Sequence, residues 1–187
     1  MARETYIAIL RGINVSGSNM LKMPVLQKLL GDAGFEDVKT YIQSGNVIFN
    51  YKASETEKLA RLIEKELNDQ LKMTVPVIVL DLETVRKVFE HNPFLKSRNE
   101  ENANLHVTFL SDSPDLEKVS KIETEKYLPD EFIFSGNAIY LFCPDGYGKT
   151  KLNNNFFENK LKQKATTRNW KTVTELVRLG EEVAKNA

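Results

Sequence analysis

The phrase Ser44-Gly45-Asn46-Val47-Ile48-Phe49 recurs later in the chain as Ser135-Gly136-Asn137-Ala138-Ile139-Tyr140. The offset is 135 − 44 = 91 residues, close to half of the 187-residue chain. In each copy a Ser-Gly-Asn turn separates two runs rich in β-branched and aromatic residues, which is the pattern of a β-hairpin. A match over six positions, four of them identical, is weak support by itself, so the flanking sequence decides whether the chain is a duplication.

Around the first phrase, the predicted order is strand, helix, strand, strand, helix, strand and a trailing helix. Apolar runs mark the strands, and apolar residues at three- and four-residue spacing mark the helices. The predicted strands are residues 6–10, 38–43, 47–51 and 75–80, and the predicted helices begin at Pro24, at a capping box of Ser54 and Glu57, and at Leu82. This order is a βαββαβ unit followed by one more helix.

The same seven elements follow in the same order around the second phrase. The predicted strands are residues 105–110, 131–134, 138–143 and 165–168, and the predicted helices begin at Ser113-Pro114, at Asn153 and at a capping box of Thr172 and Glu175. We therefore predict an α+β fold of two tandem ferredoxin-like (βαββαβ plus helix) repeats, residues 1–98 and 104–187. Because each repeat is small, we expect the two to pack as one compact body.

The same patterns predict a core. Leucine and phenylalanine stripes on the helices are expected to be buried at Leu29, Leu62, Phe89, Leu116, Phe157 and Leu176. Phe49 and Tyr140 hold matching places in the two phrases. We expect them to fill the core between the copies rather than to form the aromatic sheet face of an RNA-binding module.

Composition and charge exclude several classes of protein. The chain carries 26 basic and 26 acidic residues, so no general attraction to nucleic acid or to anionic lipid is expected. No run approaches the ~18 apolar residues of a membrane helix, and the N-terminus lacks the pattern of a signal peptide. The single cysteine, Cys143, cannot form an internal disulfide, which fits a reducing compartment. We predict a cytoplasmic protein without a membrane partner.

Metal and cofactor chemistry have little support in the sequence. One cysteine and two histidines, His91 and His106, do not supply a usual zinc site. No local motif indicates a Ser, His and carboxylate arrangement. We therefore expect neither a metal nor a cofactor, and the sequence leaves open whether the protein is an enzyme.

The predicted topology brings two polar segments of the first repeat to one end of its sheet. The first strand of a βαββαβ sheet runs parallel to the second, so residues 11–22 lie beside the hairpin turn. The candidate ligand-binding residues at this end are Arg11, Asn14, Gln43, Ser44 and Asn46. The loop also leads into a helix N-terminus, which favours anions. In the alternative interpretation, Arg11 and Asn14 tie the loop to the hairpin.

A basic cluster is predicted in the second repeat, where its third and fourth strands end together. Its members are Lys149, Lys151, Arg168, Asn169 and Trp170. Residues 144–171 carry seven basic and two acidic side chains, or 7 − 2 = +5. Gly148-Lys149-Thr150 resembles the end of a P-loop, but Cys143 stands where the first glycine is required and the predicted sheet is antiparallel. A looser phosphate cradle is predicted instead of a Walker site.

Three phrases together carry a family resemblance. They are Leu-Arg-Gly-Ile-Asn-Val at 10–15, Tyr-Ile-Gln-Ser-Gly-Asn-Val at 41–47 and Ala-Thr-Thr-Arg-Asn-Trp at 165–170. With them the chain resembles, over nearly its whole length, a mainly bacterial family catalogued as domain of unknown function 1697. The resemblance implies a two-copy α+β fold and no particular activity.

Three functional interpretations follow. The first is binding of a phosphate-bearing small molecule or nucleotide, because the two clusters supply many donors but few groups able to act as base or nucleophile. The second is a structural or protein-interaction module without a ligand. The third, less expected, is weak binding of single-stranded nucleic acid through the basic segment and Trp170. Exposed, convergent donors would favour the first interpretation, and the same side chains buried and bonded to backbone would favour the second.

Overall fold

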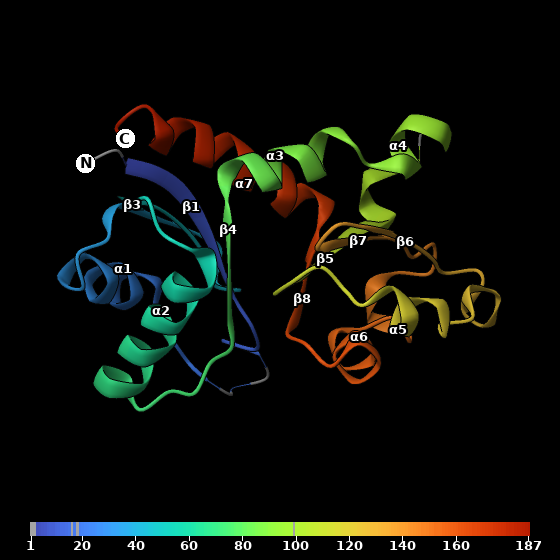
Figure 1. Ribbon diagram of the computed structural model, residues 1–187, viewed down its shortest axis with the longest axis horizontal. Helices are drawn as coiled ribbons and strands as arrows, with labels where there is room; N and C mark the ends of the chain where they lie inside the picture. The colour runs from blue at the N-terminus through green and yellow to red at the C-terminus, as the bar shows by residue number, and fades with distance from the viewer. Residues whose placement is uncertain (1–2, 16, 18, 99) are drawn as a thin grey trace. The chain divides into compact units, whose positions relative to one another are not determined.

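A computed structural model describes residues 3–15, 17, 19–98 and 100–187, and it has an α+β fold with two four-stranded antiparallel sheets (Figure 1). The chain divides into two compact units. Unit 1 comprises Met1–Arg86 and Glu175–Ala187, and unit 2 comprises Lys87–Thr174. Residues 87–98 thus belong to unit 2, and residues 175–187 belong to unit 1. The predicted repeats, residues 1–98 and 104–187, describe a duplication in the sequence rather than compact units. Their boundaries stay a prediction.

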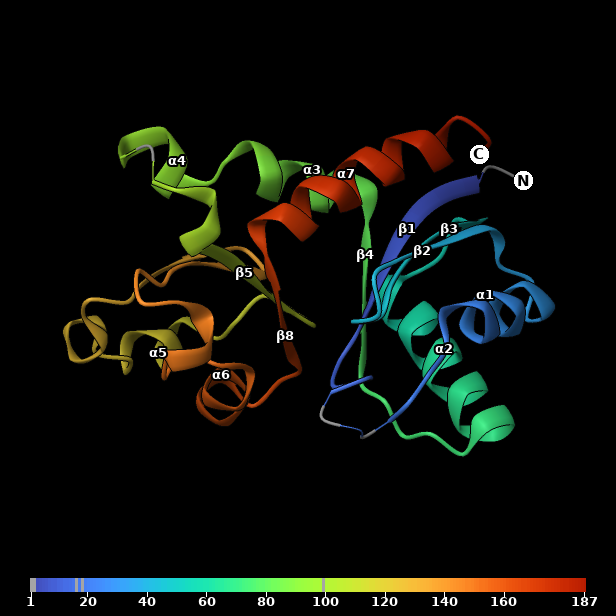
Figure 2. The same ribbon diagram turned by 180° about the vertical axis from the view of Figure 1, so that it is seen from behind.

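Unit 1 holds a sheet with the strand order β2-β3-β1-β4. Its elements are β1 (Arg3–Leu10), α1 (Met23–Asp32), β2 (Glu36–Tyr41), β3 (Asn46–Lys52), α2 (Thr56–Leu71), β4 (Val77–Asp81) and the first part of α3 (Leu82–Glu90). Figure 2 shows α1 and α2 together on one face of this sheet. The last part of α7 (Trp170–Ala184) also belongs to unit 1, where the buried Asn50 amide donates to the carbonyl oxygen of Val183 at 3.1 Å.

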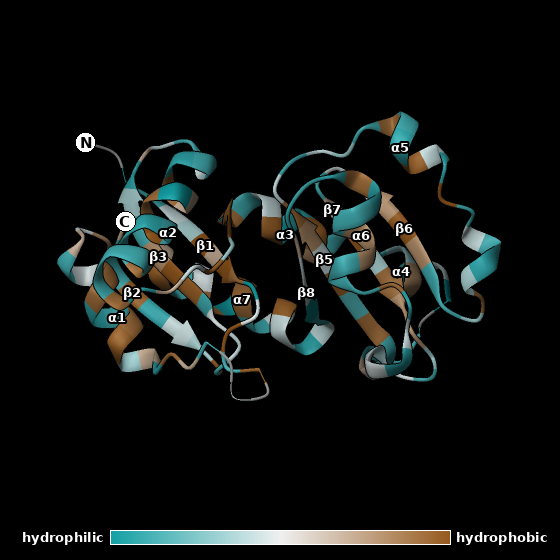
Figure 3. Cartoon of the chain, turned by 90° about the horizontal axis from the view of Figure 1, so that it is seen from below, coloured by the Kyte–Doolittle hydropathy of each residue, from teal (hydrophilic) through white to brown (hydrophobic). Residues whose placement is uncertain are grey.

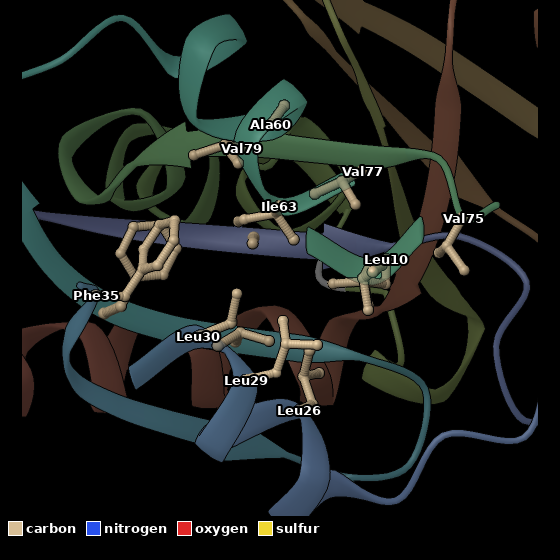
Figure 4. Packing of buried hydrophobic residues seen from close by; sticks show 14 of the residues in the cluster. Leu10, Leu26, Leu29, Leu30, Phe35, Ala60, Ile63, Val75, Val77 and Val79 are labelled. Atoms are coloured by element: carbon tan, nitrogen blue, oxygen red, sulfur yellow. The ribbon is translucent and has the colours of Figure 1, made fainter. Parts of the chain in front are cut away.

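The core of unit 1 lies between the sheet and helices α1 and α2. Alternate residues of β1 face this core, and one of them, Leu10, lies there with Leu26 and Leu30 of α1 and Ile63 of α2 (Figure 4). The helical spacing of these leucines explains why α1 forms at this place, because it puts them on one face. Leu62 lies at the margin of the core and is only partly buried.

Unit 2 holds a second sheet with the strand order β6-β7-β5-β8. Its elements are α4 (Pro93–Arg98), η1 (Asn102–Asn104), β5 (Leu105–Leu110), α5 (Leu116–Ser120), η2 (Thr124–Tyr127), β6 (Glu131–Ser135), β7 (Ala138–Phe142), η3 (Tyr147–Lys149), α6 (Asn154–Leu161) and β8 (Ala165–Asn169), together with the end of α3 and the start of α7. Figure 3 shows brown, apolar strands behind helices that are largely teal on their outer side. The order β6-β7-β5-β8 of the second sheet repeats the order β2-β3-β1-β4 of the first.

The helix predicted at Ser113-Pro114 is shorter and more exposed than expected. It spans the five residues of α5, and the Asp115 side chain caps it by accepting from the Glu117 backbone N–H. Leu116 is 80% exposed, so its assignment to the core is wrong. A five-residue helix has too few turns to turn a full apolar stripe inward.

Two predicted capping boxes are also replaced by other arrangements. The N-cap of α2 is Glu55, and the Ser54 hydroxyl donates instead to the carbonyl of Lys52. Helix α7 begins at Trp170, and the Asn169 side chain accepts from the Thr172 backbone N–H at 2.8 Å. The caps lie one residue after the predicted position in α2 and three residues before it in α7, so a different residue stands at each helix start.

The repeated phrase is one residue out of register with the repeated sheets. The last strand residues of β1 and β5 donate to equivalent turns, Leu10 to Gly45 O and Leu110 to Asn137 O, both at 2.8 Å. By this measure the offset is 137 − 45 = 92, not 91. Because side chains alternate along a strand, a shift of one residue reverses the face of every side chain.

The two aromatic residues of the phrase accordingly lie on different faces. Phe49 belongs to the core beneath α1 and α2. Tyr140 points to the face opposite its helix-side core, and its hydroxyl donates to Val88 O at 2.9 Å. The prediction that Phe49 and Tyr140 share one core is therefore wrong.

Candidate functional site

The first candidate cluster lies where β1 ends beside the β2–β3 turn. Ile9 is paired with Asn46, and the backbone N–H of Leu10 donates to Gly45 O. The loop after β1 and the turn at residues 42–45 therefore meet at one end of the sheet, as the topology predicts. Residues 16 and 18 of the loop lie outside the described residues.

Asn14 ties the loop to the turn. Its amide nitrogen donates to Leu21 O at 2.8 Å and to Gln43 O at 2.7 Å, and its side-chain oxygen accepts from the Leu21 backbone N–H at 2.8 Å. Its φ of +54° lies in the left-handed region, which asparagine tolerates better than most residues. These bonds match the interpretation in which Asn14 holds the loop in place.

The other polar residues of this cluster differ in their burial. Asn46 is fully buried and donates to Tyr41 O and to the Ser44 hydroxyl, each at 3.0 Å. Arg11 is half-buried, and its backbone N–H donates to Pro76 O. Gln43 is exposed, and its side chain makes no hydrogen bond within the described part of the chain. The donors predicted from the sequence are thus near one another, but the amides of Asn14 and Asn46 bond to the loop and the turn themselves.

Gly45 fixes the packing between the turn and the loop. Its φ is +80°, and a Cβ at this position would lie 2.5 Å from Cδ1 of Ile13 and 2.8 Å from Cβ of Leu10. Ile13 is buried and anchors the loop in the core of unit 1. Only glycine satisfies both the left-handed backbone and this close approach.

This tightly held region exposes three apolar side chains, which we call the apolar tip. They are Val15, Met20 and Ile42, with 58%, 70% and 47% of their surfaces exposed. Each follows or precedes a residue of the Asn14 hydrogen-bond network in the chain, and the Asn14 N–H donates to Asn19 O. Ile42 has a φ of +51°, a costly conformation for a β-branched residue.

Sequence reasoning did not single out the apolar tip. A visible signal existed, because Val15, Met20 and Ile42 interrupt segments that otherwise consist of turn-forming and polar residues. Apolar residues in such segments are ambiguous, however, since they can also fold back into the core as Ile13 does.

The second candidate cluster, in unit 2, combines exposed lysines with a buried arginine. Lys149 and Lys151 are exposed and form no ion pair within the described residues. Arg168 is buried, and its Nη1 donates to the Thr166 hydroxyl at 3.1 Å and to Thr167 O at 2.9 Å. Burial lowers the pKa of Arg168 to about 10, while the Tyr147 phenol acts in the opposite direction.

Asn169 and Trp170 have local structural partners. Asn169 caps α7 through its side chain. Trp170 is buried and stacks on Phe89, with ring centroids 5.6 Å apart and planes inclined by 12°. The indole face toward Phe89 is therefore occupied by another ring, which is the packing role that such a residue commonly has.

Two further reactive residues of unit 2 are buried. The His106 ring stacks on Tyr147 at 4.9 Å, and burial lowers the pKa of His106 while a backbone hydrogen bond to Asn104 acts in the opposite direction. Burial raises the pKa of the Cys143 thiol to about 11. At neutral pH both side chains are uncharged, so Cys143 is not an activated nucleophile.

The described residues contain no group of three or more His, Cys, Asp and Glu side chains arranged to hold a metal ion. They also contain no helix that is both long enough and apolar enough to cross a membrane.

The chain is similar to a family of unknown function and to a solved bacterial structure. The family described as protein of unknown function (DUF1697) matches residues 3–140. A solved structure, titled as that of the conserved bacterial protein SP0830 from Streptococcus pneumoniae, is 26% identical and superposes with a TM-score of 0.75. The similarity covers 96% of this chain and 99% of that one. No curated protein matches the chain.

Proposed function

The chain belongs to the DUF1697 family of proteins of unknown function, and from its geometry we propose that it is a protein-interaction module that binds its partner at the apolar tip of unit 1. The observation that carries the proposal is the contrast between the two kinds of side chain at this end. The amides of Asn14 and Asn46 are bonded to the protein's own backbone, whereas Val15, Met20 and Ile42 face solvent.

A fixed apolar surface supports binding more than a mobile one. The Asn14 bonds join Asn14 to Leu21 and to Gln43, and Gly45 packs against Ile13, so these contact points lose little conformational entropy when a partner docks. The left-handed backbone of Ile42 costs on the order of 1–3 kcal/mol, and conformations of that kind persist mostly at functional positions. We propose that Val15, Met20 and Ile42 form one apolar patch, and such patches commonly mark an interaction site.

The charge around the apolar tip favours an acidic partner. The charged residues in segment 10–24 are Arg11 and Lys22, and segment 40–46 contains none. Neither segment contains a carboxylate. Complementary charge mainly improves specificity and the rate of association. We therefore propose a partner segment with apolar anchors flanked by aspartate or glutamate.

The proposal is tested with peptides selected from a random library on the full-length protein. We expect acidic sequences with aliphatic or aromatic anchors, and Ile42→Asn should weaken their binding at least about tenfold, which is 1.4 kcal/mol. Asparagine accepts the left-handed backbone, so this variant removes the apolar surface without unfolding the turn. Leu116→Asn, at a still more exposed leucine of unit 2, is the control. Equal binding by all three proteins would contradict the proposal.

A phosphate-bearing small molecule or nucleotide remains a second proposal for unit 2, supported by the exposure of Lys149 and Lys151. Titration with sulfate and with ATP, read as a thermal shift, tests it. Loss of a saturable shift in Lys149→Ala would support the site, and the absence of any shift in the unmodified protein would remove it. Nucleic-acid binding has less support, because Trp170 and the strand aromatics Phe49 and Tyr140 are buried.

We also propose that units 1 and 2 derive from tandem ferredoxin-like repeats and that the protein works in the cytoplasm. The orders β2-β3-β1-β4 and β6-β7-β5-β8 support the duplication, since each is the order of a βαββαβ sheet. The absence of a cysteine pair supports the location. Fractionation of cells that express the tagged protein would test the location directly.

A further inference from the structure

Strand β6 is an unprotected edge of the second sheet. It lies at the end of the order β6-β7-β5-β8, and among the described strands it pairs only with β7. The pairing is regular, from Glu131 opposite Phe142 to Ser135 opposite Ala138, without a bulge. Its sequence, Glu-Phe-Ile-Phe-Ser, is rich in residues that favour strands.

The hydrogen-bond pattern shows which backbone groups of β6 face outward. Leu110 donates to Asn137 O, so in β7 the groups of Ile139 and Leu141 point toward β5. In an antiparallel ladder the alternate residues of β7 then bond β6. Ser135, Ile133 and Glu131 therefore bond inward, and the N–H and C=O groups of Phe132 and Phe134 face away from the sheet.

No hydrogen bond joins those outward groups to another part of the described chain. Ile133 adds an exposed apolar side chain, with 41% of its surface open to solvent. A strand that presents free N–H and C=O groups beside an apolar side chain is a template for another strand.

The equivalent edge of unit 1 is protected. Strand β2 has an irregularity between Glu36 and Lys39, and Asp37 takes a φ of +51°. Ion pairs flank it, Arg3 with Glu36 and Lys39 with Glu182. Bulges and charges of this kind are the usual means of preventing edge pairing, and β6 has no bulge and a single charged residue.

We propose that β6 is a self-association edge, at which β6 of a second copy of this chain adds antiparallel about a two-fold axis through Ile133. Phe132 then lies opposite Phe134 of the second copy, and each of these two pairs exchanges two backbone hydrogen bonds. The two four-stranded sheets become one sheet of eight strands. Such an interface is self-complementary, as two-fold symmetry requires.

The side chains fit this pairing. Glu131 faces Ser135 of the second copy, so no like charges meet. Within the chain, Arg98 Nη1 donates to the two carboxylate oxygens of Glu131 at 2.8 and 3.0 Å. Phe132 and Phe134 both pack near Phe157 on the helix side, so the new pairs extend an aromatic row across the interface. Ile133 and its copy cover each other on the opposite side. These features favour a second copy over a strand of unrelated sequence.

Sedimentation velocity of the full chain at increasing concentration tests the proposal. We expect a concentration-dependent dimer that Ile133→Lys abolishes, because two lysines would then face each other at the axis. Phe134→Pro should abolish it as well, since it removes an outward N–H and leaves the bonds to β7. Leu128→Lys, at an exposed residue outside β6, should leave the dimer unchanged. A monomer at every concentration, or a dimer that survives both β6 variants, would overturn the proposal.

Cross-linking tests the antiparallel register separately. Ile133 would lie opposite itself in a pair without hydrogen bonds, where Cα atoms are about 4.5 Å apart and within disulfide range. Ile133→Cys should therefore form a disulfide-linked dimer under mild oxidation, while Leu128→Cys should not. The native Cys143 is buried and does not compete. Equal cross-linking of the two variants would contradict the register.

Discussion

The β2–β3 turn of unit 1 and the β6–β7 turn of unit 2 join equivalent strands but are built differently. The first has four residues between Tyr41 and Asn46, and the second has two, Gly136 and Asn137. In the first, Gly45 is packed against Ile13, while a Cβ at Gly136 would meet nothing within 4 Å. One topology thus supports a turn that packs against the core and a turn that does not, so the two glycines suit their turns for different reasons.

The largest expected effect separates these two glycines. Gly45→Ala should lower the free energy of unfolding by about 3 kcal/mol, because it adds an overpacked methyl group to a strained backbone. Gly136→Ala, with a φ of +56° and open space, should cost only about 1 kcal/mol. Urea titration of both variants measures the difference, and similar midpoints would show that Gly45 is not locked by Ile13.

The loop beside the first turn should depend on one amide. Asn14→Ala leaves Leu21 and Gln43 without their side-chain partner, and we expect a loss of about 2 kcal/mol. In unit 2 the cap variant Asn169→Ala should cost about 1 kcal/mol. Thermal unfolding followed by circular dichroism compares the two. A larger loss of stability in Asn169→Ala than in Asn14→Ala would contradict the prediction that the Asn14 bonds contribute more.

The two units should also differ in their response to acid. Burial lowers the pKa of His106 below the ordinary 6.5, so the folded state holds this proton more weakly than the unfolded state. Its contribution to stability is therefore complete above about pH 6.5 and is lost as the pH falls toward the folded pKa. Unit 1 contains no histidine. His106→Phe should flatten the dependence of the urea midpoint on pH between neutral and mildly acidic conditions, and an unchanged slope would contradict this.

The smallest effect is expected in α5. Leu116→Ala should change the free energy of unfolding by less than about 0.5 kcal/mol, because the side chain is already exposed. Leu26→Ala in α1, at a fully buried residue, should cost about 2–5 kcal/mol. Both are measured by the same urea titration, and a substantial loss for Leu116→Ala would mean that α5 packs more tightly than its exposure indicates.

Periodicity predicted most of the fold because it reports directly on burial. The strands around Leu10, Phe49 and Val107 and the stripe of α1 lie where the sequence places them. Register was harder, since the letters Ser-Gly-Asn match while the turns differ by two residues. The phrase was therefore aligned one position away from the pairing of the strands.

The residues of the first candidate cluster lie at one end of the sheet as the topology predicts, but their hydrogen bonds were not foreseeable. Asn14 and Asn46 stand at the end of the sheet that the topology indicates, yet their amides bond to the carbonyls of Leu21 and Tyr41 rather than projecting outward. An amide binds its own backbone or a ligand with the same chemistry, so residue type cannot distinguish the two. The exposure of Ile42 depends on a left-handed backbone angle that the composition of the turn does not reveal.

The membership of Glu175–Ala187 in unit 1 has a consequence for how the chain is made. Ribosomes deliver the N-terminal segment first, and domains generally fold as units when their residues have emerged. Unit 1, however, includes a helix from the far end of the chain, and the buried Asn50 receives its Val183 partner only then. Unit 2, Lys87–Thr174, is continuous in sequence and is complete earlier. The unit whose synthesis begins first is thus the one whose assembly finishes last.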